Sequence, residues 1–169
     1  MAAAHLISVE EYLHTVYQPD VDYVDGHLEE RNVGEVDHSD AQSLCYFWLK
    51  SRYRDYWAGV EVRVQVKAHK FRVPDVVAVK GKKPRESVLT APPALAVEVL
   101  SPDDRMSSMQ RRIEDYLEFG VPYVWVIDPE TRRGYVYTSE GSKEAKDGVM
   151  RAGELEVPLS AIFEDSSSQ

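Results

Sequence analysis

Cysteine is almost absent from this chain of 169 residues, which contains only Cys45. A single cysteine excludes a disulfide framework and a metal site built from several thiolates, and it suits a reducing cytoplasm. Long apolar runs are missing as well, since none approaches the roughly 18 residues of a membrane span. The first six residues lack the charged and apolar regions of a signal peptide. We therefore expect a cytoplasmic protein.

Positive charge is also scarce, because the formal net charge of the chain is -9. This balance alone argues against nucleic-acid binding, since phosphate contacts require Lys and Arg. The deficit is uneven, however. From Glu61 to Arg85, eight basic residues accompany two acidic ones, a net charge of +6 that leaves -15 for the rest of the chain. The basic segment Arg63–Arg85 is either a solvated hairpin face or a surface for an acidic partner such as DNA.

Hydrophobic residues make up 43% of the chain and charged residues 29%, as in an ordinary globular protein with one core. The pattern of the first half predicts a helix capped by Ser8 and a β-hairpin that turns at Asp25-Gly26. It then predicts a core helix from about residue 37 to residue 57, followed by a strand over 61–67 with period-two alternation. We expect that strand to form an antiparallel hairpin with the strand that carries Asp75.

The second half of the chain has the pattern strand, helix, strand. A strand over 96–100 precedes a helix over 105–119 that ends at Gly120, and the apolar run 123–127 is typical of a central buried strand. This order predicts a single α/β or α+β domain over residues 1–163, with a mixed central β-sheet flanked by helices. We expect residues 164–169 to be a disordered tail.

Two carboxylates stand in strands where apolar residues would be expected. Asp75 follows Pro74 at the start of a β-branched run, and Glu98 lies inside an apolar run. Burying an ionised carboxylate is costly unless a cation or hydrogen bonds compensate for it. Two such groups on neighbouring strands favour a hard divalent cation, Mg²⁺ or Mn²⁺, to which the carbonyl of Val99 can add a third oxygen. Turn capping or pairing with arginine is the competing explanation.

Several short motifs occur in a fixed order along the chain: 23–26 (YVDG), His38, 72–77 (RVPDVV), 98–102 (EVLSP), Tyr116, 120–121 and 123–129. This ordered set resembles the Uma-two family of predicted endonucleases, within the restriction-endonuclease-like superfamily whose motif is P-D…(D/E)-x-K. The resemblance implies a restriction-endonuclease-like core that cuts DNA with Mg²⁺ or Mn²⁺. It also implies Asp75 and Glu98 as metal ligands, His38 as a further metal-site residue or general base, and, by analogy, a homodimer.

The chain departs from the superfamily motif at the lysine. Leu100 stands two positions after Glu98, and Arg112 stands where family members usually carry a lysine on the following helix. Apolar residues at helical spacing, Met106, Met109, Ile113 and Leu117, predict a core-facing stripe with Arg112 at its edge. Arginine stays protonated, so it can clamp a phosphate but cannot accept a proton from water.

These residues leave three functions open. The first is a metal-dependent endonuclease with Asp75, Glu98, Arg112 and His38 as catalytic residues. The second is a nuclease-fold protein that has lost its chemistry and serves as a nucleic-acid-binding or regulatory module, in which Arg112 merely pairs with a carboxylate and His38 caps its helix. The third is a different hydrolase, in which Asp75 and Glu98 act as an acid/base pair without metal.

Overall fold

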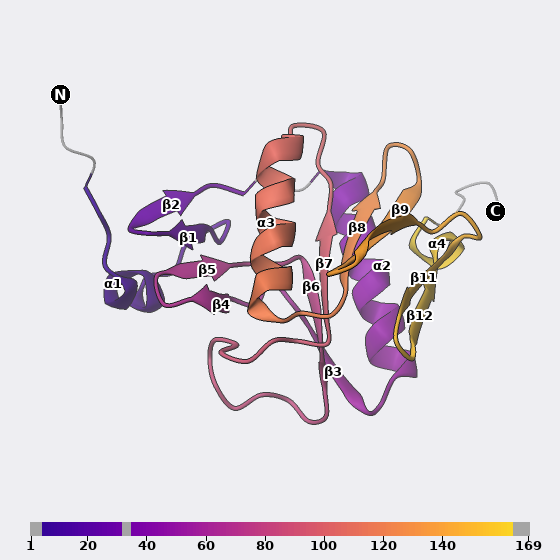
Figure 1. The fold of residues 1–169 in the computed structure, drawn as a ribbon, viewed down its shortest axis with the longest axis horizontal. Helices are drawn as coiled ribbons and strands as arrows, with labels where there is room; N and C mark the ends of the chain where they lie inside the picture. The colour runs from indigo at the N-terminus through magenta and orange to yellow at the C-terminus, as the bar shows by residue number, and fades with distance from the viewer. Residues whose placement is uncertain (1–4, 32–34, 164–169) are drawn as a thin grey trace.

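A six-stranded mixed sheet forms the centre of the protein (Figure 1). The computed structural model describes residues 5–31 and 35–163. The strand order is β10-β9-β8-β7-β6-β3. The bounds are β3 (Tyr56–Val60), β6 (Val76–Lys80), β7 (Leu95–Val99), β8 (Val124–Asp128), β9 (Arg133–Thr138) and β10 (Gly141–Glu144). Among the neighbouring strands of this sheet only β7 and β8 run parallel, and α3 (Met106–Phe119) connects them. The predicted mixed sheet is therefore confirmed.

A smaller four-stranded sheet lies beside α3, in the order β2-β1-β5-β4 (Figure 1). Its strands are β1 (Asp22–Val24), β2 (His27–Glu29), β4 (Val64–Lys67) and β5 (Lys70–Arg72). The predicted hairpin turn joins β1 to β2, with positive φ angles at both Asp25 and Gly26, as a two-residue type I′ turn requires. The first helix, α1 (Val9–His14), begins after Ser8, whose hydroxyl accepts a 3.0 Å hydrogen bond from the Glu11 N–H.

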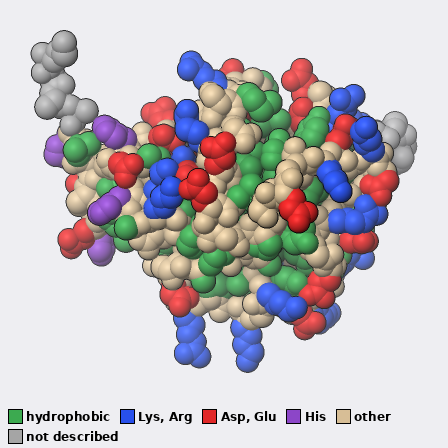
Figure 2. All heavy atoms as spheres, in the orientation of Figure 1, with side chains coloured by type: hydrophobic (Ala, Val, Ile, Leu, Met, Phe, Trp, Pro, Cys, Tyr) green, Lys and Arg blue, Asp and Glu red, His purple; other side chains and the backbone are tan. Residues whose placement is uncertain are grey.

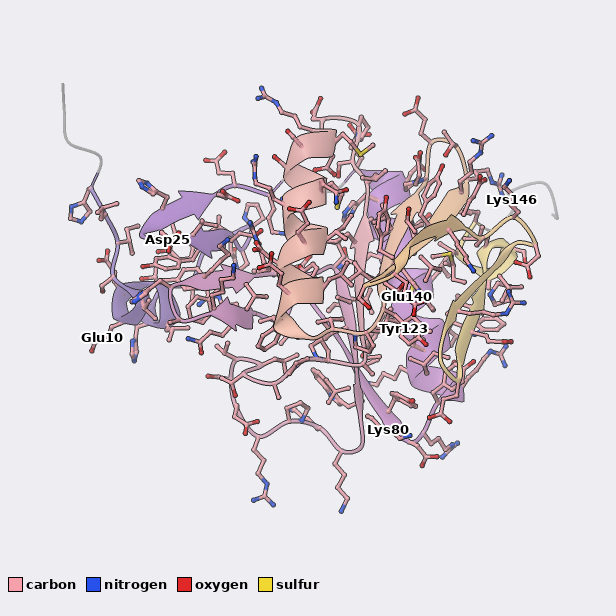
Figure 3. All side chains as sticks on the ribbon, viewed as in Figure 1. Glu10, Asp25, Lys80, Tyr123, Glu140 and Lys146 are labelled. Atoms are coloured by element: carbon pink, nitrogen blue, oxygen red, sulfur yellow. The ribbon has the colours of Figure 1, made fainter. Side chains whose placement is uncertain are left out.

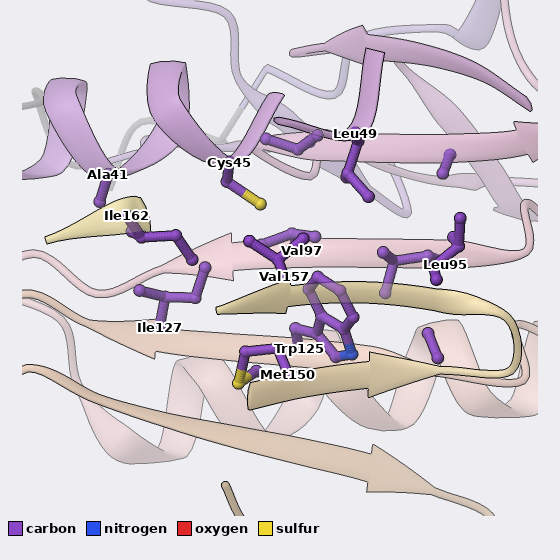
Figure 4. Close-up of a cluster of buried hydrophobic side chains, with 14 of the residues drawn as sticks. Ala41, Cys45, Leu49, Leu95, Val97, Trp125, Ile127, Met150, Val157 and Ile162 are labelled. Carbon is purple, nitrogen blue, oxygen red and sulfur yellow. The ribbon is translucent and has the colours of Figure 1, made fainter. Parts of the chain in front are cut away.

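The two faces of the central sheet bury different elements. One face packs against α2 (Val36–Arg52), α4 (Leu159–Ile162) and the hairpin of β11 (Val149–Ala152) and β12 (Leu155–Pro158) (Figure 4). The other face packs against α3 and β4. Side chains alternate along β7, so Leu95, Val97 and Val99 point to the α2 face and Ala96 to the α3 face. Glu98 follows the same alternation and points towards α3.

The predicted core helix is shorter than expected. It ends at Arg52, and Tyr56 and Trp57 belong to β3. Ala41, Cys45 and Leu49 of this helix are buried, whereas Phe47 is 67% exposed. Tyr53, Tyr56 and Trp57 follow Arg52 at a spacing that also fits a helix, although they lie outside α2. Long-range pairing of β3 with β6 decides their conformation, and local spacing does not reveal that pairing.

The predicted hairpin between the strand 61–67 and the Asp75 strand is wrong. The partner of β4 is the short strand β5, and β6 pairs instead with β3 and β7. Pro74 lies between β5 and β6, and its missing N–H interrupts a strand ladder. The chain therefore leaves the small sheet at Arg72 and enters the large sheet at Val76, with Asp75 at the crossing.

Two further expectations concern the ends and the environment of the chain. The predicted tail 164–169 lies outside the residues that the structure describes. Among the helices in the described ranges, none is both long enough and apolar enough to cross a membrane.

Candidate active site

The two strand carboxylates lie at the end of β7, whose last two residues are Glu98 and Val99. In Figure 1 this is the upper end of β7, and α2 and α3 begin near it. The β6–β7 ladder pairs Val76 with Val97, so its next step sets Asp75 opposite Glu98. Side chains directly opposite each other on one face lie about 5 Å apart at their β-carbons. Both carboxylates are only 1% exposed. The fold thus brings together the two residues predicted as ligands.

Asp75 is held from three sides. Its Oδ2 accepts a 2.7 Å hydrogen bond from the Val99 N–H and lies 3.4 Å from the His38 Nε2. Its Oδ1 accepts a hydrogen bond from the Arg31 guanidinium. Burial alone would raise the pKa of Asp75, but the hydrogen bond from His38, the charge of Arg31 and the Val99 N–H outweigh it and lower that pKa. Asp75 is therefore a stable carboxylate.

The negative charge of Glu98 is compensated less completely than that of Asp75. Its Oε1 accepts a 2.6 Å hydrogen bond from the Tyr116 hydroxyl, and its Oε2 lies 3.7 Å from the Arg112 Nη1. The pKa of Glu98 is raised to about 7, first by burial and then by the negative charge of Asp75. The charges of Arg112 and Arg31 and the hydrogen bond from Tyr116 lower this pKa, but they offset the rise only in part. A further cation at this position would favour the ionised form.

Arg112 reaches Glu98 as the helix spacing predicts, and it also contacts the small sheet. Its Nε lies 3.4 Å from the Oδ2 of Asp22, and the residue is only 9% exposed. Burial alone would lower the pKa of Arg112, but Glu98 and Asp22 raise it. Met106 of the predicted core stripe is instead 72% exposed, because α3 begins there, beyond the region that the sheet covers.

His38 lies in the first turn of α2 and approaches Asp75 from the opposite side to α3. Burial alone would lower its pKa, but the hydrogen bond and charge of Asp75 raise it. In this conformation His38 is a hydrogen-bonding partner of Asp75. Its role as a metal ligand or general base stays a prediction.

Sequence reasoning misses three contributors to the site. Arg31 lies 44 residues before Asp75, outside every strand and motif, so no local signal indicates it. Asp22 belongs to the small sheet, and only the tertiary structure brings it to Arg112. Tyr116 belongs to the ordered motifs, but those motifs assign it no role. Tyr116 lies four residues after Arg112, so both side chains project from the same side of α3. This spacing is the signal in the sequence that could have indicated Tyr116.

The donors at this site are of the type that Mg²⁺ and Mn²⁺ prefer. Asp75 and Glu98 supply carboxylate oxygens. In an extended strand the N–H and C=O of one residue point to the same side, so the Val99 carbonyl faces β6, as its N–H does. No group of three His, Cys, Asp or Glu side chains within the described residues is already arranged around a common metal position. Instead, Arg31 and His38 contact the two carboxylate oxygens of Asp75.

A pocket of about 390 Å³ opens beside His38. Besides His38 and Ser101, its walls contain five carboxylate residues: Glu35, Asp37, Asp104, Asp128 and Glu130. Such a lining repels phosphate and attracts cations.

The basic segment Arg63–Arg85 is largely neutralised within the molecule. Five of its cations form ion pairs: Arg63, Lys67, Lys70, Arg72 and Lys80. Arg72 is 2% exposed, which corrects its assignment to a DNA-facing surface. Within the described residues, the remaining three, Lys82, Lys83 and Arg85, make no ion pair and are exposed.

The exposed cations do not lie beside Asp75. Asp75 precedes β6, whereas Lys82 and Lys83 follow its end, and five residues of strand span about 17 Å. Lys80, the last residue of β6, lies in the lower part of Figure 3. Figure 2 shows basic and acidic side chains intermixed on the visible face.

Comparison with known proteins identifies relatives of this fold. Residues 9–166 match the model of the Uma2 family, described as "Putative restriction endonuclease". A crystal structure from Anabaena variabilis, described as that of "a putative nuclease belonging to DUF820", superposes with a TM-score of 0.80 at 24% sequence identity. The alignment covers 93% of this chain and 97% of that one. No curated protein matches. Both the resemblance and the fold class predicted from the sequence are confirmed.

Proposed function

The chain belongs to the Uma2 family, and from this premise we propose that it is a metal-dependent endonuclease that hydrolyses phosphodiester bonds of DNA. The family description supports a nuclease. The observation that carries the proposal is the buried pair Asp75 and Glu98, in which Glu98 has too little positive charge around it and its pKa is raised to about 7. Mg²⁺ or Mn²⁺ would be held by these two carboxylates and the carbonyl of Val99.

A bound Mg²⁺ or Mn²⁺ would supply Lewis-acid polarisation of a phosphoryl oxygen and a lowered pKa of water. The chain's own residues have separate tasks. Tyr116 fixes the Oε1 of Glu98, and the Val99 N–H fixes the Oδ2 of Asp75. Arg112 stays protonated and offers positive charge to a phosphate. His38 is the side chain proposed to accept a proton at its imidazole.

The substrate and assembly are proposed from the family and from charge. The acidic pocket beside His38 would draw divalent cations towards Asp75, and DNA would approach only after they neutralise that edge. Of the basic segment, Lys82, Lys83 and Arg85 remain as candidate contacts to the DNA backbone. A homodimer would supply the two active sites needed to cut both strands.

One observation favours the second function, a binding or regulatory module without turnover. Arg112 takes the place of the usual lysine and is held between Glu98 and Asp22, 3.7 Å and 3.4 Å away. A permanently protonated guanidinium cannot accept a proton from water. If His38 does not fill that role, the fold would bind nucleic acid and metal without cleaving.

Nicking of supercoiled plasmid in the presence of Mn²⁺ or Mg²⁺ tests the proposal. We expect Asp75→Asn and Glu98→Gln each to lower the nicking rate about 1000-fold, since the metal contributes several kcal/mol to the barrier. Glu140→Gln, a change at an exposed turn residue, is the matched control and should leave the rate unchanged.

Three other results would redirect the assignment. Metal binding by calorimetry with no cleavage of duplex, single-stranded or supercoiled DNA would favour the binding module. Cleavage that persists in chelator would favour the metal-free acid/base pair. Equal nicking by wild type and both variants would show that the activity comes from elsewhere.

A further inference from the structure

Arg31 is the one site residue that belongs to neither the predicted motifs nor a regular element. It lies between β2, which ends at Glu29, and α2, which begins at Val36. Its side chain is only 10% exposed, and its guanidinium forms an ion pair with the Oδ1 of Asp75. A long cationic side chain is thus buried against the carboxylate that the proposed function assigns to a metal.

The surroundings of Arg31 are strongly anionic. Burial alone would lower its pKa, but the negative charges of Asp75, then Glu98, then Asp22 outweigh burial and raise it. The same charge of Arg31 helps to lower the pKa of Asp75 and opposes the rise at Glu98. Arg31 therefore supplies to both strand carboxylates part of the positive charge that a divalent cation would supply.

The two oxygens of Asp75 have different partners. Oδ2 accepts the 2.7 Å hydrogen bond from the Val99 N–H of the neighbouring strand and also faces His38. Oδ1 is the oxygen left for a cation, and the guanidinium of Arg31 occupies it. A divalent cation and a guanidinium cannot share one carboxylate oxygen closely, because their charges repel each other.

We propose that Arg31 holds the cation position on Asp75 in the metal-free protein, and that a divalent cation must displace its guanidinium in order to bind. The proposal rests on the proposed metal site. Because the cation must displace this guanidinium, Arg31 raises the concentration of divalent cation at which the site is half-occupied. Without Arg31, the metal-free protein would carry a buried carboxylate that has lost its closest cation, which is strongly unfavourable.

Mn²⁺ titration calorimetry and thermal unfolding, with and without Mn²⁺, test this exchange. We expect Arg31→Gln to lower the unfolding temperature of the metal-free protein and to tighten Mn²⁺ binding at least tenfold. Its unfolding temperature should also rise further on adding Mn²⁺ than that of wild type. Arg31→Lys keeps the charge and should bind Mn²⁺ with nearly wild-type affinity.

Arg63→Gln is the matched control, because Arg63 is also a partly buried arginine in an ion pair, with Asp20, 2.8 Å away. It should lower the unfolding temperature without changing Mn²⁺ affinity. A second readout uses the wild-type chain alone. On titration with Mg²⁺, the Arg31 Nε–H resonance should move to the position of a solvent-exposed arginine and exchange faster with water.

The possible failures are distinct. If Asp75→Asn abolishes Mn²⁺ binding but Arg31→Gln binds no tighter than wild type, Arg31 is not a competitor and only this inference fails. An Arg31 resonance that stays unchanged while Mg²⁺ binds would also overturn this inference alone. If neither wild type nor Arg31→Gln binds Mn²⁺, the metal site fails, and the exchange fails with it.

Discussion

Two clusters of buried charge meet at Arg112, and they differ in how completely their charges are compensated. In the first, the guanidinium of Arg72 contacts the carboxylates of Asp22, Glu29 and Asp115 at 2.9, 2.7 and 2.8 Å. In the second, Glu98 has its closest cation contact, from Arg112, at 3.7 Å. The first cluster is saturated with close ion pairs, whereas the second leaves one carboxylate with a pKa raised to about 7.

The difference separates a structural role from a functional one. The Arg72 cluster joins β1, β2, β5 and α3, so it fixes α3 against the small sheet. Asp22 belongs to this cluster and also contacts Arg112, so the structural cluster positions one cation of the site. The incomplete compensation of the Glu98 charge is the feature on which the proposed metal site depends.

The largest effect is expected from breaking the saturated cluster. Arg72→Met would leave Asp22 and Asp115 buried with their main cation removed, and we expect a loss of about 3–5 kcal/mol of unfolding free energy. Urea denaturation measures it. Arg151→Gln, which removes exposed ion pairs with Asp147 and Glu156, is the control and should leave stability nearly unchanged. Equal denaturation midpoints for the two variants would contradict the structural role of the cluster.

An effect of opposite sign is expected at the incomplete cluster. The folded-state pKa of Glu98, about 7, lies above the unfolded value of 4.5, so the native protein binds the extra proton between these values. The unfolding free energy of the metal-free protein should therefore fall as pH rises from about 5 to 7, by up to about 1.4 kcal/mol per pH unit. Below pH 4.5 the carboxyl is protonated in both states and contributes no such penalty.

Glu98→Gln removes this titration while keeping an acceptor for Tyr116. At pH 8, in chelator, we expect the variant to be about 1–3 kcal/mol more stable than wild type, with a flatter pH profile. His38, whose pKa is raised, acts in the same direction, because its stabilisation is lost as pH rises through its folded-state pKa. A shallow slope should therefore remain. Parallel profiles for wild type and Glu98→Gln would show that Glu98 is fully compensated after all.

The smallest effect expected is the change with pH in the cost of removing the Tyr116 hydroxyl. Tyr116→Phe removes the 2.6 Å hydrogen bond to Glu98, a bond to a charged group at pH 8, and should cost about 1.5–3 kcal/mol there. At pH 5, where Glu98 is protonated, the cost should fall to about 1 kcal/mol. Tyr137→Phe, at a half-buried tyrosine of β9, is the control for loss of a hydroxyl. A pH-independent cost would mean that the bond does not depend on the charge of Glu98.

Much of the fold follows from local pattern. The Asp25-Gly26 turn, the helix that ends at Gly120 and the buried strand β8 could be predicted because turn chemistry, capping and apolar runs act over a few residues. The end of α2 and the partner of β6 could not, because they depend on strand pairing between distant segments. The site divides in the same way: the motifs indicated Asp75 and Glu98, but no local pattern indicated Arg31.

The sequence alone determined the family, the two carboxylates and the replacement of lysine by Arg112, since these are matters of residue identity and order. The tertiary structure decided which charges surround each carboxylate. Electrostatic compensation depends on distance and burial, and chain order fixes neither. Hence Arg72, predicted at a DNA surface, is a buried structural cation, and Arg31, unmarked in the sequence, lies on the proposed metal ligand.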